Sequence, residues 1–158
     1  KINLNHWLEQ LIADLKYHNH YATELLVNVS DHDQVHEVIF DPSQLTQVVT
    51  NIAQNGLRYS MQNTGTPSLT FNLHRDNETG LSLLDIIDDG LGISDDQQQH
   101  LFEPFYTTET KGTGLGLYIS RELCDANESR LDYLFTPDNR SCFRISFPHS
   151  DRRLLLQE

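Results

Sequence analysis

The sequence predicts an α+β fold: a two-layer α/β sandwich in which helices cover one face of a single mixed sheet. Its 158 residues suit one domain with a sizeable core. Segments with apolar residues at helical spacing are interspersed with segments of strand-like pattern, and no internal repeat divides the chain. We therefore expect one domain over residues 1–150, followed by a short C-terminal tail over 151–158.

The first part of the chain contains one expected helix and two expected strands. Residues 4–17 place leucine and isoleucine side chains near helical spacing, and Asn5 is the expected N-cap. Two short strands follow at 24–30 and 35–40, separated by the turn-like sequence DHDQ.

A second helix is expected over residues 41–60. Asp41 suits the N-cap, and Pro42 suits the first helical position, where its missing N–H has no intrahelical partner to lose. Spacings of three and four residues then place one apolar stripe along this helix, formed by Leu45, Val48, Val49, Ile52 and Ala53.

The second half of the chain supplies two more helices and the remaining strands. A short helix is expected over 95–102, within an otherwise irregular segment over 89–112. A glycine-rich stretch opens another helix, which runs to about Ala126. Alternating and apolar patterns predict strands at 68–74, 81–88, 130–135 and 142–147.

The chain is acidic, with 11 Lys and Arg against 23 Asp and Glu and a formal charge of −12. This balance argues against a nucleic-acid partner, because binding to a phosphate backbone relies on clustered cations. A polyanionic ligand would need local hydrogen-bond donors or a metal ion, since the overall field of the protein opposes it.

No apolar run approaches the length of a membrane span, and no signal-peptide pattern occurs, so we expect no membrane contact by this chain. The chain begins with Lys, so we expect a piece of a longer protein, and an anchor elsewhere in that parent stays open. Cys124 and Cys142 form no CxxC pair, which favours a reducing, intracellular setting. The eight histidines show no recognised ligand spacing, and we interpret them as scattered surface residues.

Four polar residues lie close together on the helix over 41–60. Asn51 and Asn55 are one turn apart, and Arg58 and Tyr59 follow within the next turn. An asparagine oxygen suits Mg²⁺ that keeps most of its water and phosphate ligands. Arg58 can meet phosphate oxygens, and Tyr59 can lie against a base or ribose. Taken alone, the pattern also fits the ordinary polar face of an amphipathic helix.

The segment IIDDGLGI, residues 86–93, ends a strand at Asp88 and places Gly90 and Gly92 directly after it. An ionised carboxylate can only accept hydrogen bonds. Adenine presents an amine donor at its six-position and guanine presents a carbonyl, so one aspartate can select adenine. The alternative is a simple turn in which the glycines adopt left-handed conformations.

The stretch KGTGLGLYIS, residues 111–120, places glycines at alternate positions before an apolar run. Glycines let backbone N–H groups approach an anion, and the N-terminus of the following helix is partially positive, so a bound phosphate is one explanation. A flexible surface loop is the other. The stretch is neither G-x-G-x-x-G, since Leu117 replaces the third glycine, nor a P-loop, since Gly112 follows Lys111 where Ser or Thr is required.

Together with LFEPFYTT at 101–108, these segments resemble the ATP-binding domain of sensor histidine kinases, in the superfamily of gyrase, chaperone, kinase and mismatch-repair ATPases. NIAQN resembles the N box, DDGLG the first glycine box, FEPF the F box and GTGLGL the second glycine box. The resemblance spans about residues 4–147 and implies the Bergerat fold, with a mobile ATP lid over roughly 93–112. Residues 118–133 further resemble the branch that controls type IV pilin transcription and is related to nitrogen-regulating sensor kinases.

The resemblance implies roles for individual residues. Asn55 would bind Mg²⁺, Asn51 would support phosphate or metal, and Arg58 would contact phosphate; these three form the implied catalytic set. Asp88 would bind the adenine amine. The other implied contacts to ATP are Tyr59, Gly90, Gly92, Ile93, Phe102, Phe105, Lys111, Gly112, Thr113, Gly114, Leu115, Gly116 and Leu117.

Two of these residues, Phe102 and Phe105, would anchor the lid, whose closure is a gating motion that enzymes use around nucleotides. The chain also departs from the family pattern. Gly56 stands where alanine is usual, which we expect to weaken the helix locally. Gln54 stands where an acidic residue is frequent, which puts an acid/base role at that position in doubt. Substitutions of the commoner Asn and Pro at 89 and 91 have no expected consequence.

The resemblance also bears on the chemistry. Gyrase-like and chaperone-like relatives carry a glutamate base one turn before the metal asparagine, and this chain has Asn51 there. Asparagine cannot take a proton at neutral pH, so we expect a phosphoryl donor to another protein and not an autonomous ATPase. The acceptor would be a histidine on the dimerisation helices of the parent kinase, which we expect before Lys1, because the His36–Glu37 pair lacks the acceptor motif.

Phosphate would then pass to the receiver domain of a response regulator. The resemblance further implies a homodimeric parent that is anchored in the bacterial inner membrane, with this domain in the cytoplasm. Two alternatives of the same fold stay open: a degenerate nucleotide-binding regulatory module, and a serine kinase of the anti-sigma-factor type. The sequence FEPFYTT favours the histidine kinase class.

Overall fold

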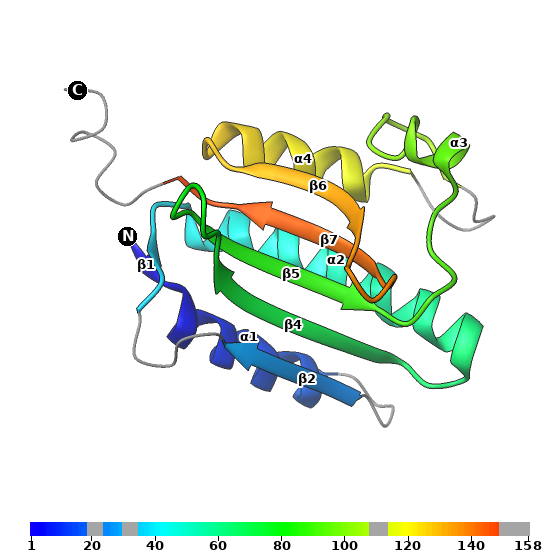
Figure 1. Cartoon of the computed structure of the whole chain (residues 1–158), viewed down its shortest axis with the longest axis horizontal. Coiled ribbons are helices and arrows are strands. Elements are labelled where there is room, and N and C mark those ends of the chain that lie inside the picture. Colours follow the sequence, from blue (N-terminus) through cyan, green and yellow to red (C-terminus); the bar gives the residue numbers. More distant parts are fainter. Residues whose placement is uncertain (19–23, 30–34, 108–113, 149–158) are drawn as a thin grey trace.

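A computed structural model describes residues 1–18, 24–29, 35–107 and 114–148. Its centre is a five-stranded sheet in the order β2-β4-β5-β7-β6, with helices behind one face (Figure 1). The strand β2 runs parallel to β4 and every other neighbouring pair is antiparallel, so the sheet is mixed. The predicted α+β sandwich is therefore confirmed. The five strands are β2 (Glu24–Val29), β4 (Ser68–Arg75), β5 (Ser82–Asp88), β6 (Arg130–Phe135) and β7 (Ser141–Ser146).

The core lies between the sheet and the helices. Because side chains alternate across a strand, every second residue of the central strands faces the helices. These residues are almost fully buried and meet the apolar stripe predicted for the second helix. They include Leu69, Phe71, Leu73, Leu84, Ile86, Phe143 and Ile145.

The first helix, α1 (Leu4–His18), matches its prediction in extent, but the predicted cap is wrong. The side-chain oxygen of Asn3 accepts the His6 N–H at 3.2 Å, as a capping side chain does. Asn5 instead accepts the backbone N–H of His36 at 2.9 Å, from the segment that carries β3 (Glu37–Val38). This short strand pairs with β1 (Ile2–Asn3) in a separate two-stranded sheet.

The second helix, α2 (Pro42–Thr64), begins as predicted and ends four residues later than the predicted end. Asp41 accepts the Gln44 N–H at 3.0 Å, which confirms it as the N-cap. Gly65 ends the helix with φ +81° and donates its N–H to the Met61 carbonyl, the usual left-handed glycine cap. The remaining helices are α3 (Asp95–Gln98), shorter than the predicted 95–102, and α4 (Gly116–Ala126).

Gly56, which we expect to weaken its helix, also has a packing role, because α2 lies against the sheet there. A Cβ atom at Gly56 would lie 2.5 Å from Leu69 Cδ2 and 3.3 Å from Asp88 Cβ. Leu69 and Asp88 are cross-strand partners on β4 and β5. The absent side chain therefore lets the helix contact the sheet at the end of the strand that carries Asp88.

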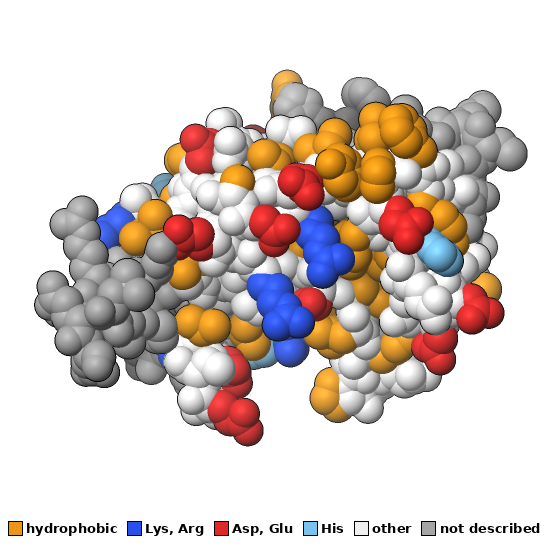
Figure 2. Space-filling model, turned by 90° about the horizontal axis from the view of Figure 1, so that it is seen from above, with side chains coloured by type: hydrophobic (Ala, Val, Ile, Leu, Met, Phe, Trp, Pro, Cys, Tyr) orange, Lys and Arg blue, Asp and Glu red, His pale blue; other side chains and the backbone are white. Residues whose placement is uncertain are grey.

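The interpretation of the histidines as surface residues is wrong for His36. Its side chain is 0% exposed, and its Nδ1 lies 2.9 Å from the Ser82 hydroxyl. Cys124 and Cys142 are both free thiols and both buried. On the surface seen in Figure 2, acidic side chains are scattered among apolar and uncharged ones, and most of the basic side chains gather near its centre.

No helix within the described part of the chain is both long enough and apolar enough to cross a membrane.

Candidate functional site

The predicted adenine contact, Asp88, lies at the end of β5 between Leu69 on β4 and Ser141 on β7. It is only 2% exposed. Its Oδ1 accepts the Gly90 N–H at 2.8 Å, and the Ser141 side chain also hydrogen-bonds the carboxyl group. Burial raises the pKa of Asp88 to about 6, with a smaller contribution from the neighbouring Asp89 charge, and these hydrogen bonds oppose the rise only in part.

A second buried aspartate on the same strand, Asp85, has a structural role and serves as a comparison for Asp88. Asp85 points to the opposite face of the sheet and is 3% exposed. Arg144 donates from Nε and one terminal nitrogen to its two oxygens, at 2.7 and 3.0 Å, and His74 Nε2 lies 2.9 Å from Oδ2. Burial alone would raise the pKa of Asp85, but these partners outweigh it and hold the pKa below its usual value.

Among the described residues, no cation is in direct contact with Asp88, and the arginine that acts on its charge, Arg140, is held by other groups. Arg140 donates to Asp89 Oδ1 at 2.9 Å and to Thr70 Oγ1 at 3.2 Å. The backbone N–H of Asp89 is in turn bound by the Ser60 hydroxyl at 2.8 Å. A buried carboxylate with a raised pKa, surrounded by N–H and O–H donors, is typical of a binding or catalytic site.

The two glycines after Asp88 occupy positions that a side chain could not. A Cβ at Gly90 would lie 2.8 Å from Asp88 Oδ1 and 2.8 Å from Tyr59 Cβ. Gly92 has φ +87°, and a Cβ there would lie 2.7 Å from the Phe135 ring. Tight packing between the first glycine box, α2 and β6 therefore explains both residues.

The structure brings the predicted residues of α2 to the same region. Asn51, Asn55 and Tyr59 are half-buried, and Arg58 is exposed. A terminal nitrogen of Arg58 donates to Asn55 Oδ1 at 2.7 Å, and the guanidinium lies 5.7 Å from the centre of the Tyr59 ring. The Asn55 oxygen thus faces a cation already, which fits the predicted metal contact.

The donor set also fits a metal held mainly by phosphate and water. Within the part of the chain that the structure describes, no three His, Cys, Asp or Glu side chains are grouped as a metal site. An asparagine oxygen on its own would leave most positions of Mg²⁺ to water and phosphate oxygens, as this metal prefers.

Of the two predicted lid anchors, only Phe102 packs inward. Its ring meets Phe143 edge-on at 6.3 Å, and the Arg121 guanidinium from α4 lies 4.6 Å from its centre. Phe105 is 74% exposed, so the prediction that its side chain anchors the lid is wrong. It contributes through its backbone instead: its N–H donates to the Gly114 carbonyl at 2.9 Å, and it adopts φ +67°.

The second glycine box is described only in part, because Lys111, Gly112 and Thr113 lie outside the described residues. Gly114 has φ +72°, and a Cβ there would lie 2.4 Å from the Phe105 carbonyl carbon. Gly116 is the first residue of α4, and Leu117 packs against the core. Leu115 precedes the helix and has no side-chain atom that could cap it, which suits a helix end that receives an anion.

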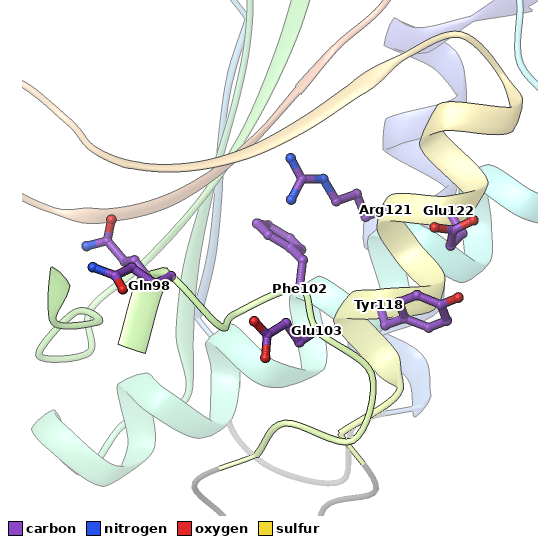
Figure 3. A pocket seen from close by; sticks show the side chains of 7 residues that line it. Gln98, Phe102, Glu103, Tyr118, Arg121 and Glu122 are labelled. Atoms are coloured by element: carbon purple, nitrogen blue, oxygen red, sulfur yellow. The ribbon is translucent and has the colours of Figure 1, made fainter. Parts of the chain in front are cut away.

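A cavity of about 190 Å³ opens beside Phe102, between α3 and α4 (Figure 3). Arg121 lies over the Phe102 ring on one side of it. It shares only Phe102 with the predicted nucleotide contacts, and Asp88 is not among its lining residues. Its lining residues are Gln98, Gln99, Phe102, Glu103, Tyr118, Arg121 and Glu122.

Two residues that the sequence reasoning missed, Tyr133 and Ser141, connect the parts of this site. The Tyr133 hydroxyl accepts the Ile93 N–H at 2.9 Å and lies 2.8 Å from the Ser141 hydroxyl. A sequence signal existed, since the alternation of RLDYLF puts Tyr133 on the core side with Leu131, where its phenol needs a polar partner.

Comparisons with known proteins agree with this geometry. Residues 40–151 match the family described as histidine kinase-, DNA gyrase B-, and HSP90-like ATPase. The sensor protein kinase PilS of Pseudomonas aeruginosa is 43% identical over 149 residues, which are 94% of this chain and 28% of PilS. The chain thus spans little more than a quarter of that relative.

Solved structures of histidine kinases share the fold. The catalytic domain of histidine kinase ThkA has a TM-score of 0.73 at 22% identity, with 93% of each chain covered. Full-length ShkA, solved in complex with AMPPNP, has a TM-score of 0.74 at 21% identity, and the match covers 93% of this chain and 30% of ShkA. The chain belongs to the histidine kinase-, DNA gyrase B- and HSP90-like ATPase family, and it is an ATP-binding catalytic domain of the sensor histidine kinase type.

Proposed function

We propose that this chain binds ATP with Mg²⁺ and donates the γ-phosphoryl group to a histidine on the dimerisation helices of its parent kinase. The observation that carries the proposal is the buried Asp88 carboxylate, held between N–H and O–H donors and in contact with no cation of the described residues. The solved complex of ShkA with AMPPNP, a protein of the same fold, supports the choice of an adenine nucleotide.

Asp88 selects the base. Its Oδ1 is already used by Gly90, which leaves acceptor capacity on the carboxylate for a donor in the pocket. The six-amino group of adenine is such a donor, whereas the carbonyl of guanine would face a carboxylate and be repelled. The tight packing at Gly90 and Gly92 holds the backbone beside Asp88 in place.

The polar face of α2 holds the phosphate end. Asn55 is the metal contact, Asn51 lies one turn before it, and Arg58 reaches the phosphate oxygens. Asn55 would hold the metal through its side-chain oxygen, to which Arg58 donates in this structure, and the planar Arg58 guanidinium would suit the phosphate oxygens as a further partner. When bound, Mg²⁺ neutralises charge on the phosphates and so favours transfer.

The chain has no base to activate water at the position where ATPases of the family carry glutamate, since Asn51 stands there. Its residues therefore position the triphosphate, and the rate depends on an incoming imidazole nitrogen. His36 does not supply that nitrogen, because it is fully buried. We place the acceptor on the parent's dimerisation helices, and a receiver domain of a response regulator takes the phosphoryl group next.

The 43% identity to the sensor protein kinase PilS supports a sensor kinase as the parent, and the pilin-regulating branch that residues 118–133 resemble is our proposal for it. We further propose that this parent is a homodimer anchored in the inner membrane, with this domain in the cytoplasm. The test mixes this chain, γ-labelled ATP and Mg²⁺ with the parent's dimerisation hairpin, supplied as a separate protein. We expect an acid-labile label on the hairpin, as phosphohistidine gives. An acid-stable label on serine would favour the anti-sigma-factor type, and ATP binding without transfer would favour the regulatory module.

A further inference from the structure

A continuous series of hydrogen bonds joins Asp88, the proposed adenine contact, to Ile93, the residue at which the predicted lid begins. It runs from the Ile93 N–H to the Tyr133 hydroxyl, then to the Ser141 hydroxyl, and ends at the Asp88 carboxyl group. The first two links measure 2.9 and 2.8 Å. These hydrogen bonds thus connect the segment 88–93 to β6 and β7, which follow it by about 40 residues or more and carry Tyr133 and Ser141.

Tyr133 is the centre of this series of hydrogen bonds, and its ring is fixed by packing. The ring lies 5.0 Å from Phe143 and 5.7 Å from Phe135, in edge-on arrangements. Phe143 is fully buried and also receives the Phe102 ring from the predicted lid. The position of the Tyr133 hydroxyl is therefore set by the core, so whatever it binds is held in place.

The direction of the hydrogen bonds is determined by the two ends. The Ile93 N–H can only donate, so the Tyr133 oxygen accepts there and its own proton is available for Ser141. The Ser141 hydroxyl then accepts a hydrogen bond from the Tyr133 hydroxyl and donates a hydrogen bond to the Asp88 carboxylate. The ionised Asp88 carboxylate, which offers acceptors on both oxygens, satisfies the Gly90 N–H and the Ser141 hydroxyl together. Burial raises the pKa of Tyr133 above its usual value, so the phenol stays protonated and donates.

We propose that Tyr133 is a positioning residue of the nucleotide site: its hydroxyl holds the Ile93 backbone and, through Ser141, keeps Asp88 oriented as an acceptor for the base. The inference rests on the proposed function, since it assigns Asp88 to adenine. Within the described ranges, the other charged groups that act on Asp88 are Asp89 and Arg140, which pair with each other at 2.9 Å.

The first variant is Tyr133→Phe, which keeps the ring and removes the hydroxyl. Loss of one buried hydrogen bond at each end should weaken ATP binding about tenfold at pH 7 in a calorimetric titration. As the pH is lowered, the variant should lose ATP binding at a higher pH than wild type does, because the ionised form of Asp88 is less well stabilised by hydrogen bonds. In the free protein, amide hydrogen exchange at Ile93 should accelerate about tenfold.

The matched control is Tyr118→Phe, which removes a hydroxyl beside the cavity on α4 and should change none of these quantities. A second variant, Ser141→Ala, cuts only the link to Asp88. It should shift the pH dependence of ATP binding in the same direction as Tyr133→Phe and leave Ile93 exchange unchanged, since Tyr133 still accepts that N–H. Thermal melts of all three variants establish that each is folded.

The outcomes distinguish a failure of the role proposed for Tyr133 from a failure of the proposed function. If the wild-type chain binds ATP and Tyr133→Phe shows the same affinity, pH dependence and Ile93 exchange, the role of Tyr133 is overturned and the proposed function stands. If Tyr133→Phe does not fold, an unchanged pH dependence in Ser141→Ala overturns the role by itself. If the wild-type chain binds neither ATP nor GTP, the proposed function fails and the assignment of Tyr133 fails with it.

Discussion

The Asp88→Asn variant should make the protein more stable and its nucleotide site weaker. Asp88 is 2% exposed, and its pKa of about 6 lies above the 3.8 of an unperturbed carboxyl. That difference corresponds to about 3 kcal/mol against the ionised form in the folded state. The asparagine keeps an oxygen for the Gly90 N–H but carries no charge, so it avoids most of this cost.

The sign of the pH dependence follows from the raised pKa. The stability that wild-type Asp88 contributes is fully present below pH 3.8 and is lost as the pH rises through about 6. The variant should therefore be more stable than wild type by about 1–3 kcal/mol at pH 8, and this advantage should disappear by about pH 4. Urea unfolding at several pH values measures the difference in the free energy of unfolding.

ATP affinity should change in the opposite direction. The variant presents an amide N–H₂ where the carboxylate presented acceptors, and a lost hydrogen bond to a charged group is worth about 1.5–3 kcal/mol, or roughly 10- to 100-fold in Kd. A variant that is destabilised at pH 8, or whose stability difference from wild type is the same at pH 4 and pH 8, would refute the reasoning. Unchanged ATP affinity would remove Asp88 from the site.

Three further predictions concern other parts of the structure. Asp85→Asn should destabilise the protein by about 2 kcal/mol at pH 7 in urea unfolding, because it breaks a buried pair with Arg144, and the loss should shrink as the pH falls below 4. Gly56→Ala should lower the free energy of unfolding by about 1 kcal/mol, since overpacking against Leu69 outweighs the gain in helix propensity; a more stable variant would contradict this. Asn55→Ala should abolish the strengthening of ATP binding by Mg²⁺ in calorimetry, and a wild-type magnesium response would exclude Asn55 as the ligand.

The sequence predicted those parts of the fold that depend on local pattern. Strands with one buried face and the apolar stripe of α2 follow from periodicity alone, and Asp41 with Pro42 marks a helix start by chemistry that needs no tertiary contact. Asn5 failed as a cap because its side chain bonds His36, which is 31 residues away. Distant partners of this kind leave no trace in a local pattern.

The sequence could predict which residues form the candidate site, but not the residues that hold them in position. The boxes located Asp88 and Asn55, and the structure brings their elements together. Phe105 looked like a second aromatic anchor, but its left-handed backbone turns it outward, which no composition pattern encodes. Tyr133 was missed for the opposite reason: its hydroxyl finds Ile93 only after β6 has packed against the first glycine box.

The most direct test of the account is a calorimetric titration of this chain with ATP and with GTP, each with and without Mg²⁺. The account predicts that ATP binds, that Mg²⁺ strengthens its binding, and that GTP gives no response. GTP binding as tight as ATP would contradict the role of Asp88, and no binding of either nucleotide would contradict the proposed function itself.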